Sequence, residues 1–92
     1  MPYTIDLTDE AKLNIKQATD YYLDISTSLN DKFTSDLIKT IDGLRDNPLH
    51  FQIRYRNIRI AITETFPFGI HFIIEGNTIL LLKVLHSKRF YK

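Results

Sequence analysis

The chain has 92 residues, no cysteine and a formal net charge of +1. This length accommodates one domain with one core, which we place at residues 1–92. The lack of cysteine excludes disulfides and thiolate metal sites and fits a reducing compartment. No stretch is long enough to cross a bilayer, and the first residues lack the basic and apolar order of a signal peptide. We therefore expect a cytoplasmic protein with no membrane association.

Charge is divided unevenly along the chain. Residues 1–50 hold five Lys/Arg and nine Asp/Glu, a balance of −4, and residues 51–92 hold seven and two, a balance of +5. The split predicts a basic surface on the C-terminal part that attracts a polyanion or an acidic partner. The alternative is solvated strand edges protected by Lys and Arg.

The first third of the chain predicts a short strand and a helix. Tyr3, Ile5 and Leu7 alternate with polar residues, as in a half-buried strand. Thr8 is a plausible N-cap for a helix from about residue 9 to residue 26, with two carboxylates in the first turn. The helix presents an apolar stripe at helical spacing: Leu13 or Ala11, then Ile15, Ala18, Tyr22 and Ile25.

A second helix is expected from Asn30 or Asp31 to Arg45, after a break at residues 26–28. Asn47-Pro48 stops it. The two helices should form an antiparallel hairpin across one face of a sheet. The apolar stripe of this second helix is Phe33, Leu37, Ile38, Ile41 and Leu44.

Three strands are predicted in the second half, after an irregular connection over residues 49–57. Ile58, Ile60 and Ile62 alternate with other residues, so we expect the isoleucines to face the helices and Arg59 and Ala61 to face the open side. A strand from Phe68 to Ile74 follows the Phe66-Pro67 turn. Residues 75–77 form a hairpin turn with Gly76 at positive φ.

The last strand, residues 79–85, contains a single charged residue, Lys83. We interpret it as a central strand buried on both faces for much of its length. The predicted fold class is therefore α+β with the order β-α-α-β-β-β, a helical hairpin packed on one face of a mainly antiparallel sheet. The residues after this strand should gather at one sheet edge: His86, Lys88, Arg89, Tyr91 and Lys92.

The composition offers few motifs for chemistry. The three histidines lack further ligands at zinc-binding spacing, and the three glycines are scattered, so we expect no metal, no phosphate loop and no cofactor. A basic and aromatic set remains, which suits phosphate binding. Metal-independent RNA cleavage would use His86 as acid or base, with Arg59 and Arg89 on the phosphate. A histidine beside a strand end is more often an ordinary boundary residue, and that alternative stays open for His86.

Two motifs carry a resemblance to a known family. The segment Arg59-x6-Phe66-Pro-Phe68-x-Ile70-x-Phe72, followed by Val84-Leu-His86-Ser-x-Arg89, resembles the C-terminal signature of the RelE/ParE superfamily of bacterial toxins. The resemblance implies a toxin of a type II toxin-antitoxin pair, bound in a heteromeric assembly by a cognate antitoxin. Members of one branch cut messenger RNA in the ribosomal A site, and the ParE branch poisons DNA gyrase.

Departures from the superfamily pattern favour the ParE-like branch. Ribosome-dependent nucleases often carry an arginine where this chain has Gly69, and many relatives have tyrosine at Phe68 and Phe72. The alternatives are a nuclease and a degenerated, non-catalytic binding module. For a nuclease, the catalytic candidates are Arg59, His86, Arg89 and Tyr91. The partner or nucleic-acid surface is expected at Arg54, Arg56, Lys83, Lys88 and Lys92, with a partner segment on the open sheet face.

Overall fold

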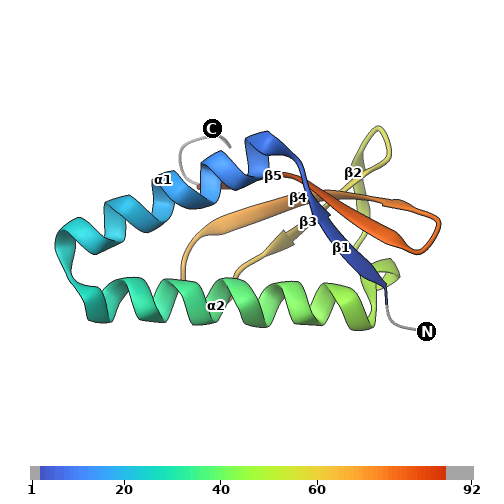
Figure 1. Ribbon diagram of the computed structural model, residues 1–92. Coiled ribbons are helices and arrows are strands. Elements are labelled where there is room, and N and C mark those ends of the chain that lie inside the picture. Colours follow the sequence, from blue (N-terminus) through green and yellow to red (C-terminus); the bar gives the residue numbers. More distant parts are fainter. Residues whose placement is uncertain (1–2, 87–92) are drawn as a thin grey trace.

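The computed structural model describes residues 3–86, which form a helical hairpin packed on a five-stranded sheet (Figure 1). The strand order is β1-β5-β4-β3-β2, in which only the β1–β5 pair is parallel. This confirms the predicted α+β class. The elements are β1 (Thr4–Leu7), α1 (Asp9–Ile25), α2 (Thr27–Asp46), the short 3₁₀ helix η1 (Pro48–His50), β2 (Ile53–Tyr55), β3 (Ile58–Ile62), β4 (Phe68–Glu75) and β5 (Thr78–His86).

Both helices begin at hydroxyl caps. The Thr8 side chain accepts a hydrogen bond from the Ala11 backbone N–H (3.1 Å), as predicted, and the Ser26 side chain accepts one from Leu29 (3.0 Å). The predicted start of the second helix at residue 30 or 31 was therefore wrong. Ser26 alone separates the two helices, because its cap satisfies the first turn of α2 immediately after α1 ends.

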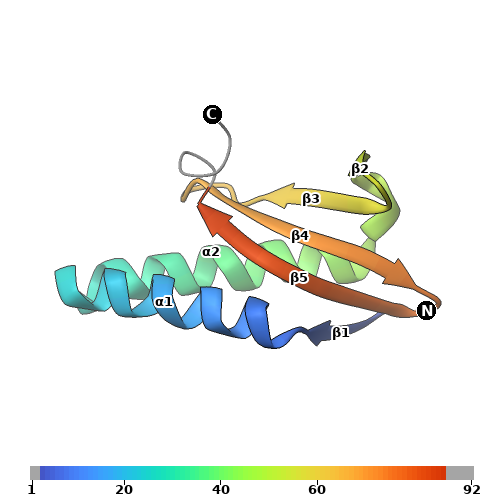
Figure 2. The same ribbon diagram turned by 90° about the horizontal axis from the view of Figure 1, so that it is seen from above.

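The core lies between the helical hairpin and one face of the sheet, with α1 against β5 and α2 against β3 (Figure 2). At one end of this core, four aromatic rings from α1, α2 and the β3–β4 region pack with centroids 5.0 to 6.3 Å apart, a spacing typical of stabilising aromatic pairs. The predicted helix stripes supply much of the core, but Ile25 and Ile38 are exposed. The four rings are Tyr22, Phe33, Phe66 and Phe68.

Strand β5 pairs with β4 along its length, and its other edge is bonded first to β1 and then to Thr8 and α1. Strand β1 pairs with residues 78–81, and beyond it α1 takes over. The Thr8 hydroxyl donates to the Leu82 carbonyl (2.9 Å), and the Asn14 side-chain oxygen accepts from the Val84 N–H (3.0 Å). The expectation of burial on both faces was wrong for β5, whose residues alternate between buried and half-buried. In the strand order, β4 is the middle strand, and its residues 68–72 are all buried.

The orientation of β3 differs from the prediction. Ala61 lies opposite Ile70, and both are fully buried in the core, whereas Ile62 is 53% exposed. Arg59 lies opposite the buried Phe72 and so shares the helix-facing side. The isoleucines therefore point to the open side of the sheet. The prediction failed because it assigned the more apolar stripe to the core, while the packing against α2 accommodates a small alanine.

Strand β2 was not predicted, because residues 49–57 show no clear alternation. It is a three-residue edge strand with all residues exposed, paired with β3 across an irregular register. Two side-chain hydrogen bonds hold it. Arg59 Nη1 donates to the Phe51 carbonyl just before β2 (2.6 Å), and the Tyr55 hydroxyl is bonded to His71 Nδ1 on β4 (2.9 Å).

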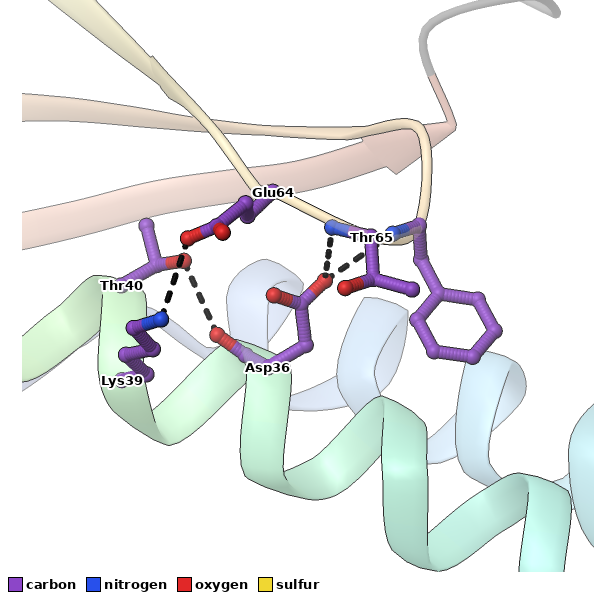
Figure 3. Close-up of polar contacts among 6 residues, drawn as sticks. Asp36, Lys39, Thr40, Glu64 and Thr65 are labelled. Atoms are coloured by element: carbon purple, nitrogen blue, oxygen red, sulfur yellow. Dashed lines mark hydrogen bonds and ion pairs between the residues drawn. The ribbon is translucent and has the colours of Figure 1, made fainter.

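The turn between β3 and β4 is fixed to α2 by one carboxylate. Asp36 is 7% exposed, and its Oδ2 accepts hydrogen bonds from the backbone N–H groups of Thr65 (3.0 Å) and Phe66 (2.9 Å) (Figure 3). A buried carboxylate satisfied in this way ties the helix to the sheet. Nearby, Lys39 forms an exposed ion pair with Glu64 (3.1 Å) across the same junction.

Candidate functional surfaces

The predicted site residues are not collected into one site in the structure. Arg54 and Arg56 are exposed at the β2–β3 hairpin, Lys83 is half-buried on the open face, and Arg59 and His86 are half-buried on the helix-facing side. The remaining predicted residues lie outside the described part of the chain: Lys88, Arg89, Tyr91 and Lys92.

Arg59 is engaged in the fold. Its guanidinium donates to the Phe51 carbonyl at 2.6 Å, and the strand residue opposite it is the buried Phe72. This contact closes the connection between η1 and β2, so it accounts for a charged residue on the helix-facing side of β3. The expectation that Arg59 points to the open face was wrong.

His86 ends β5 beside an apolar groove. Its ring packs edge-on against Phe68, with centroids 5.2 Å apart. The groove, about 420 Å³ in volume, lies between α1 and the ends of β4 and β5. Two exposed side chains at its rim, Tyr21 and Ile25, are each 58% exposed. The groove is lined by Asn14, Gln17, Ala18, Tyr21, Tyr22, Ile25, Phe68, Val84, Leu85 and His86.

The separation of Arg59 and His86 bears on RNA cleavage. Arg59 pairs with residue 72 of β4, and His86 pairs with residue 68 of the same strand. Four residues along a strand correspond to about 13 Å, and the two side chains stand on strands that flank β4. A shared phosphate requires an acid or base and a cation within hydrogen-bond reach. Arg59 and His86 therefore do not form one catalytic pair in this structure.

The open face carries a different polar cluster in the middle of the sheet. His71 lies opposite Lys83 on β5 and is hydrogen-bonded through Nδ1 to the Tyr55 hydroxyl. It is only 3% exposed, and burial lowers its pKa from the ordinary value near 6.5, with the neighbouring Lys83 charge adding to the effect. His71 is thus held neutral at pH 7 and links the edge strand to β4.

Two further classes of feature were sought in residues 3–86, metal-ion clusters and membrane-spanning helices. No three His, Asp or Glu side chains converge there in a way that would hold a metal ion. Among the helices of the same stretch, none combines the length and the apolar character needed to span a bilayer.

Comparisons with known proteins identify the family of the chain and a solved structure with a similar fold. A family model described as "ParE toxin of type II toxin-antitoxin system, parDE" matches residues 5–91. The chain belongs to the ParE toxin family. A solved structure described as "Chromosomal ParDE TA system from P. aeruginosa" superposes with a TM-score of 0.78 at 19% identity, over 91% of this chain and 95% of that one. At 19% identity, the structural match shows that the two chains share a fold and nothing more. No curated protein matches the chain.

The ParE assignment confirms the family expected from the Phe66-to-Phe72 motif and the end of β5. Sequence reasoning missed Tyr55 and His71 as a pair, because their contact depends on β2, which was not predicted. One signal was available: Tyr55 stands between two arginines, and His71 interrupts the apolar residues of a strand.

Proposed function

We propose that this ParE-family chain is a growth-inhibiting toxin that acts by binding DNA gyrase and that a cognate antitoxin neutralises it in the cytoplasm. The observation that carries the choice of a binding activity is the placement of the nuclease candidates. Arg59 is bonded to the Phe51 carbonyl, and His86 lies on another strand about 13 Å further along the sheet.

A second observation supports the same choice. Gly69, which stands where ribosome-dependent nucleases often carry an arginine, is buried between Ile62 and Leu85 in the strand register. It offers no cation at this point of the open face. A phosphate-directed cation is a major contributor to transition-state stabilisation in metal-free phosphoryl chemistry.

The α1–β5 groove is the proposed docking place for the antitoxin. Its walls are mainly aromatic and aliphatic, and Tyr21 and Ile25 expose more than half of their surface at its rim. Exposed apolar side chains beside a concave surface are typical of protein interaction sites. An amphipathic antitoxin segment would cover them. The further expectation that the open sheet face receives a partner segment stays a prediction.

The target is tested with the purified chain in a supercoiling assay with DNA gyrase. We expect loss of supercoiling and accumulation of gyrase-cleaved DNA, both reversed by adding the protein encoded next to this gene. Unchanged supercoiling at stoichiometric excess would reject gyrase as the target. A matched variant, Tyr21→Ser with Ile25→Ser, should keep the gyrase effect and lose rescue by the antitoxin.

The rival nuclease activity has its own assay. A toeprint experiment on ribosomes translating a defined message should show no cleavage in the A site. A cut that disappears in His86→Gln would establish the nuclease and overturn the proposal.

A further inference from the structure

The turn between β2 and β3 holds an arginine in a backbone conformation suited to glycine. Arg56 has φ of 52° and is the only non-glycine residue with positive φ in residues 3–86. The first turn residue of the β4–β5 hairpin, Gly76, has nearly the same φ, 60°. Both two-residue turns end in asparagine. An L-residue with a Cβ is disfavoured in this region, so arginine at position 56 carries a conformational cost that glycine would avoid.

Within residues 3–86, the Arg56 side chain does not help to hold the fold together by hydrogen bonds or ion pairs. Arg54 and Arg56 are both exposed, and neither makes a side-chain hydrogen bond or ion pair with another described residue. Arg59, by contrast, is bonded to Phe51. Residues 47–63 contain three arginines and no Asp or Glu. The charge of the hairpin is therefore not neutralised by an ion pair within residues 3–86. Residues held in sparsely populated backbone conformations cluster at functional sites, so this turn is a candidate contact site.

The hairpin is also held firmly enough to present these charges. Arg59 fixes the backbone before β2, and the Tyr55–His71 hydrogen bond fixes the strand one residue before the turn. Lys83 lies opposite His71 on β5, so it adds a cation to the side of the sheet that Tyr55 reaches. The hairpin protrudes from the sheet on the side away from the helices (Figure 1). Strand β2 is the edge strand at the other side of the sheet from β1, and α1 packs against β5.

We propose that the β2–β3 hairpin contacts the phosphate backbone of duplex DNA through Arg56 and Arg54. Guanidinium groups bind phosphates in a fork. Duplex DNA has one charge per about 1.7 Å of axis. A few exposed cations therefore add more to the binding affinity for a duplex than to that for a single strand. Backbone contacts of this kind position a protein on DNA without reading sequence. The inference goes beyond the proposed function, because it does not depend on gyrase being the protein target.

The test is fluorescence anisotropy of the purified full chain with a labelled 30-base-pair duplex at several salt concentrations, alongside thermal unfolding. Arg56→Gly should bind the duplex about tenfold more weakly, with a log–log salt slope reduced by about 0.9 for one lost phosphate contact. Its Tm should rise by a few degrees, because the strain is relieved. Arg56→Lys should retain part of the affinity with an unchanged Tm.

The control is Lys12→Ala, which removes the same charge from an exposed position on α1. Its affinity for the duplex should stay close to that of the natural chain. If Lys12→Ala and Arg56→Gly lose equal affinity for the duplex, the loss reflects the net charge of the chain, and the proposal is overturned. The proposal also fails if the natural chain does not bind the duplex at low salt, if Arg56→Gly binds it normally, or if the Tm of Arg56→Gly falls.

Two further arms separate the alternatives. If Arg56→Gly keeps its DNA affinity and loses affinity for gyrase or antitoxin, the hairpin contacts protein and the DNA assignment is wrong. A labelled single-stranded RNA of the same length should bind more weakly than the duplex, and the reverse order would contradict the choice of duplex DNA. DNA binding that depends on Arg56 without any gyrase inhibition would sink the proposed function and leave this inference standing.

Discussion

The β4–β5 and β2–β3 hairpins have turns of similar backbone conformation but with different residues at the position of positive φ. Each uses a two-residue turn with positive φ at the first position, but β4–β5 places Gly76 there and β2–β3 places Arg56. The strands of β4–β5 have eight and nine residues and contribute several fully buried side chains. Strand β2 has three residues, all exposed. The first hairpin contributes buried core residues, whereas the second has exposed strand residues and carries a conformational cost at Arg56.

The largest expected contrast is between core residues of the two hairpins. Leu81→Ala should destabilise the chain by about 2 to 5 kcal/mol, because Leu81 is fully buried on β5. Ile53→Ala on β2 should change stability by about 0.5 kcal/mol, since Ile53 is 53% exposed. Urea denaturation measures both. Similar losses at the two positions would mean that β2 belongs to the cooperative core.

The second-largest loss of stability is expected at the β3–β4 turn, which joins the two hairpins and is bonded to Asp36. Asp36→Ala removes the acceptor for the Thr65 and Phe66 N–H groups and should cost about 2 kcal/mol. Asp36→Asn keeps one side-chain oxygen and should lose less. Denaturation curves that do not distinguish alanine from asparagine would show that this carboxylate is not the anchor.

Exchanging the turn residue tests the comparison directly. Gly76→Arg should destabilise by about 1 to 2 kcal/mol, because a Cβ there meets no atom within 4 Å and only the φ of 60° opposes it. Thermal unfolding should show the loss. A neutral outcome would mean that this turn relaxes to suit arginine and that Arg56 is not strained either.

The hydrogen bond between Tyr55 and His71, which holds the β2–β3 hairpin, should contribute less to stability. Tyr55→Phe removes the 2.9 Å hydrogen bond to His71 and should cost about 1 kcal/mol. Hydrogen exchange should accelerate at the β2–β3 amides and stay unchanged in β5. Uniform acceleration across the sheet would instead indicate that the bond supports the whole fold.

The smallest effect is a pH dependence. The pKa of His71 is lowered in the folded state by burial and then by Lys83, so the unfolded chain takes up a proton first as the pH falls past about 6.5. Stability is retained above that pH and declines below it. His71→Gln should flatten the decline in urea titrations at pH 8 and pH 5.5, and an unchanged slope would assign it to other groups.

Local features of the fold were predictable, and long-range ones were less so. The Thr8 cap and the Gly76 turn each depend on a few neighbouring residues, and both were confirmed. Strand β4 also forms where it was expected, but its residues 68–72 are all buried instead of alternating. The predicted orientation of β3 was wrong, because the sequence does not show whether Ala61 or Ile62 is packed against the helices. Strand β2 was missed, since three exposed residues show no period.

The candidate surfaces show the same division. The basic residues at 54, 56 and 83 were found from charge and spacing, but the strain at Arg56 is invisible in a sequence without its turn geometry. The link between Tyr55 and His71 crosses from β2 to β4 and needs strand pairing. Their roles as partner or DNA contacts stay predictions, as do those of Lys88, Arg89, Tyr91 and Lys92.

By itself, the sequence determined the helices, most of the strands, the uneven charge and the toxin family, because these depend on short-range periodicity, capping and motif order. Only the tertiary structure decided that Arg59 is tied to Phe51, that His86 lies in a groove and that Arg56 stands in a strained turn. Those outcomes depend on which faces are buried against each other, and burial is a property of the packed chain as a whole.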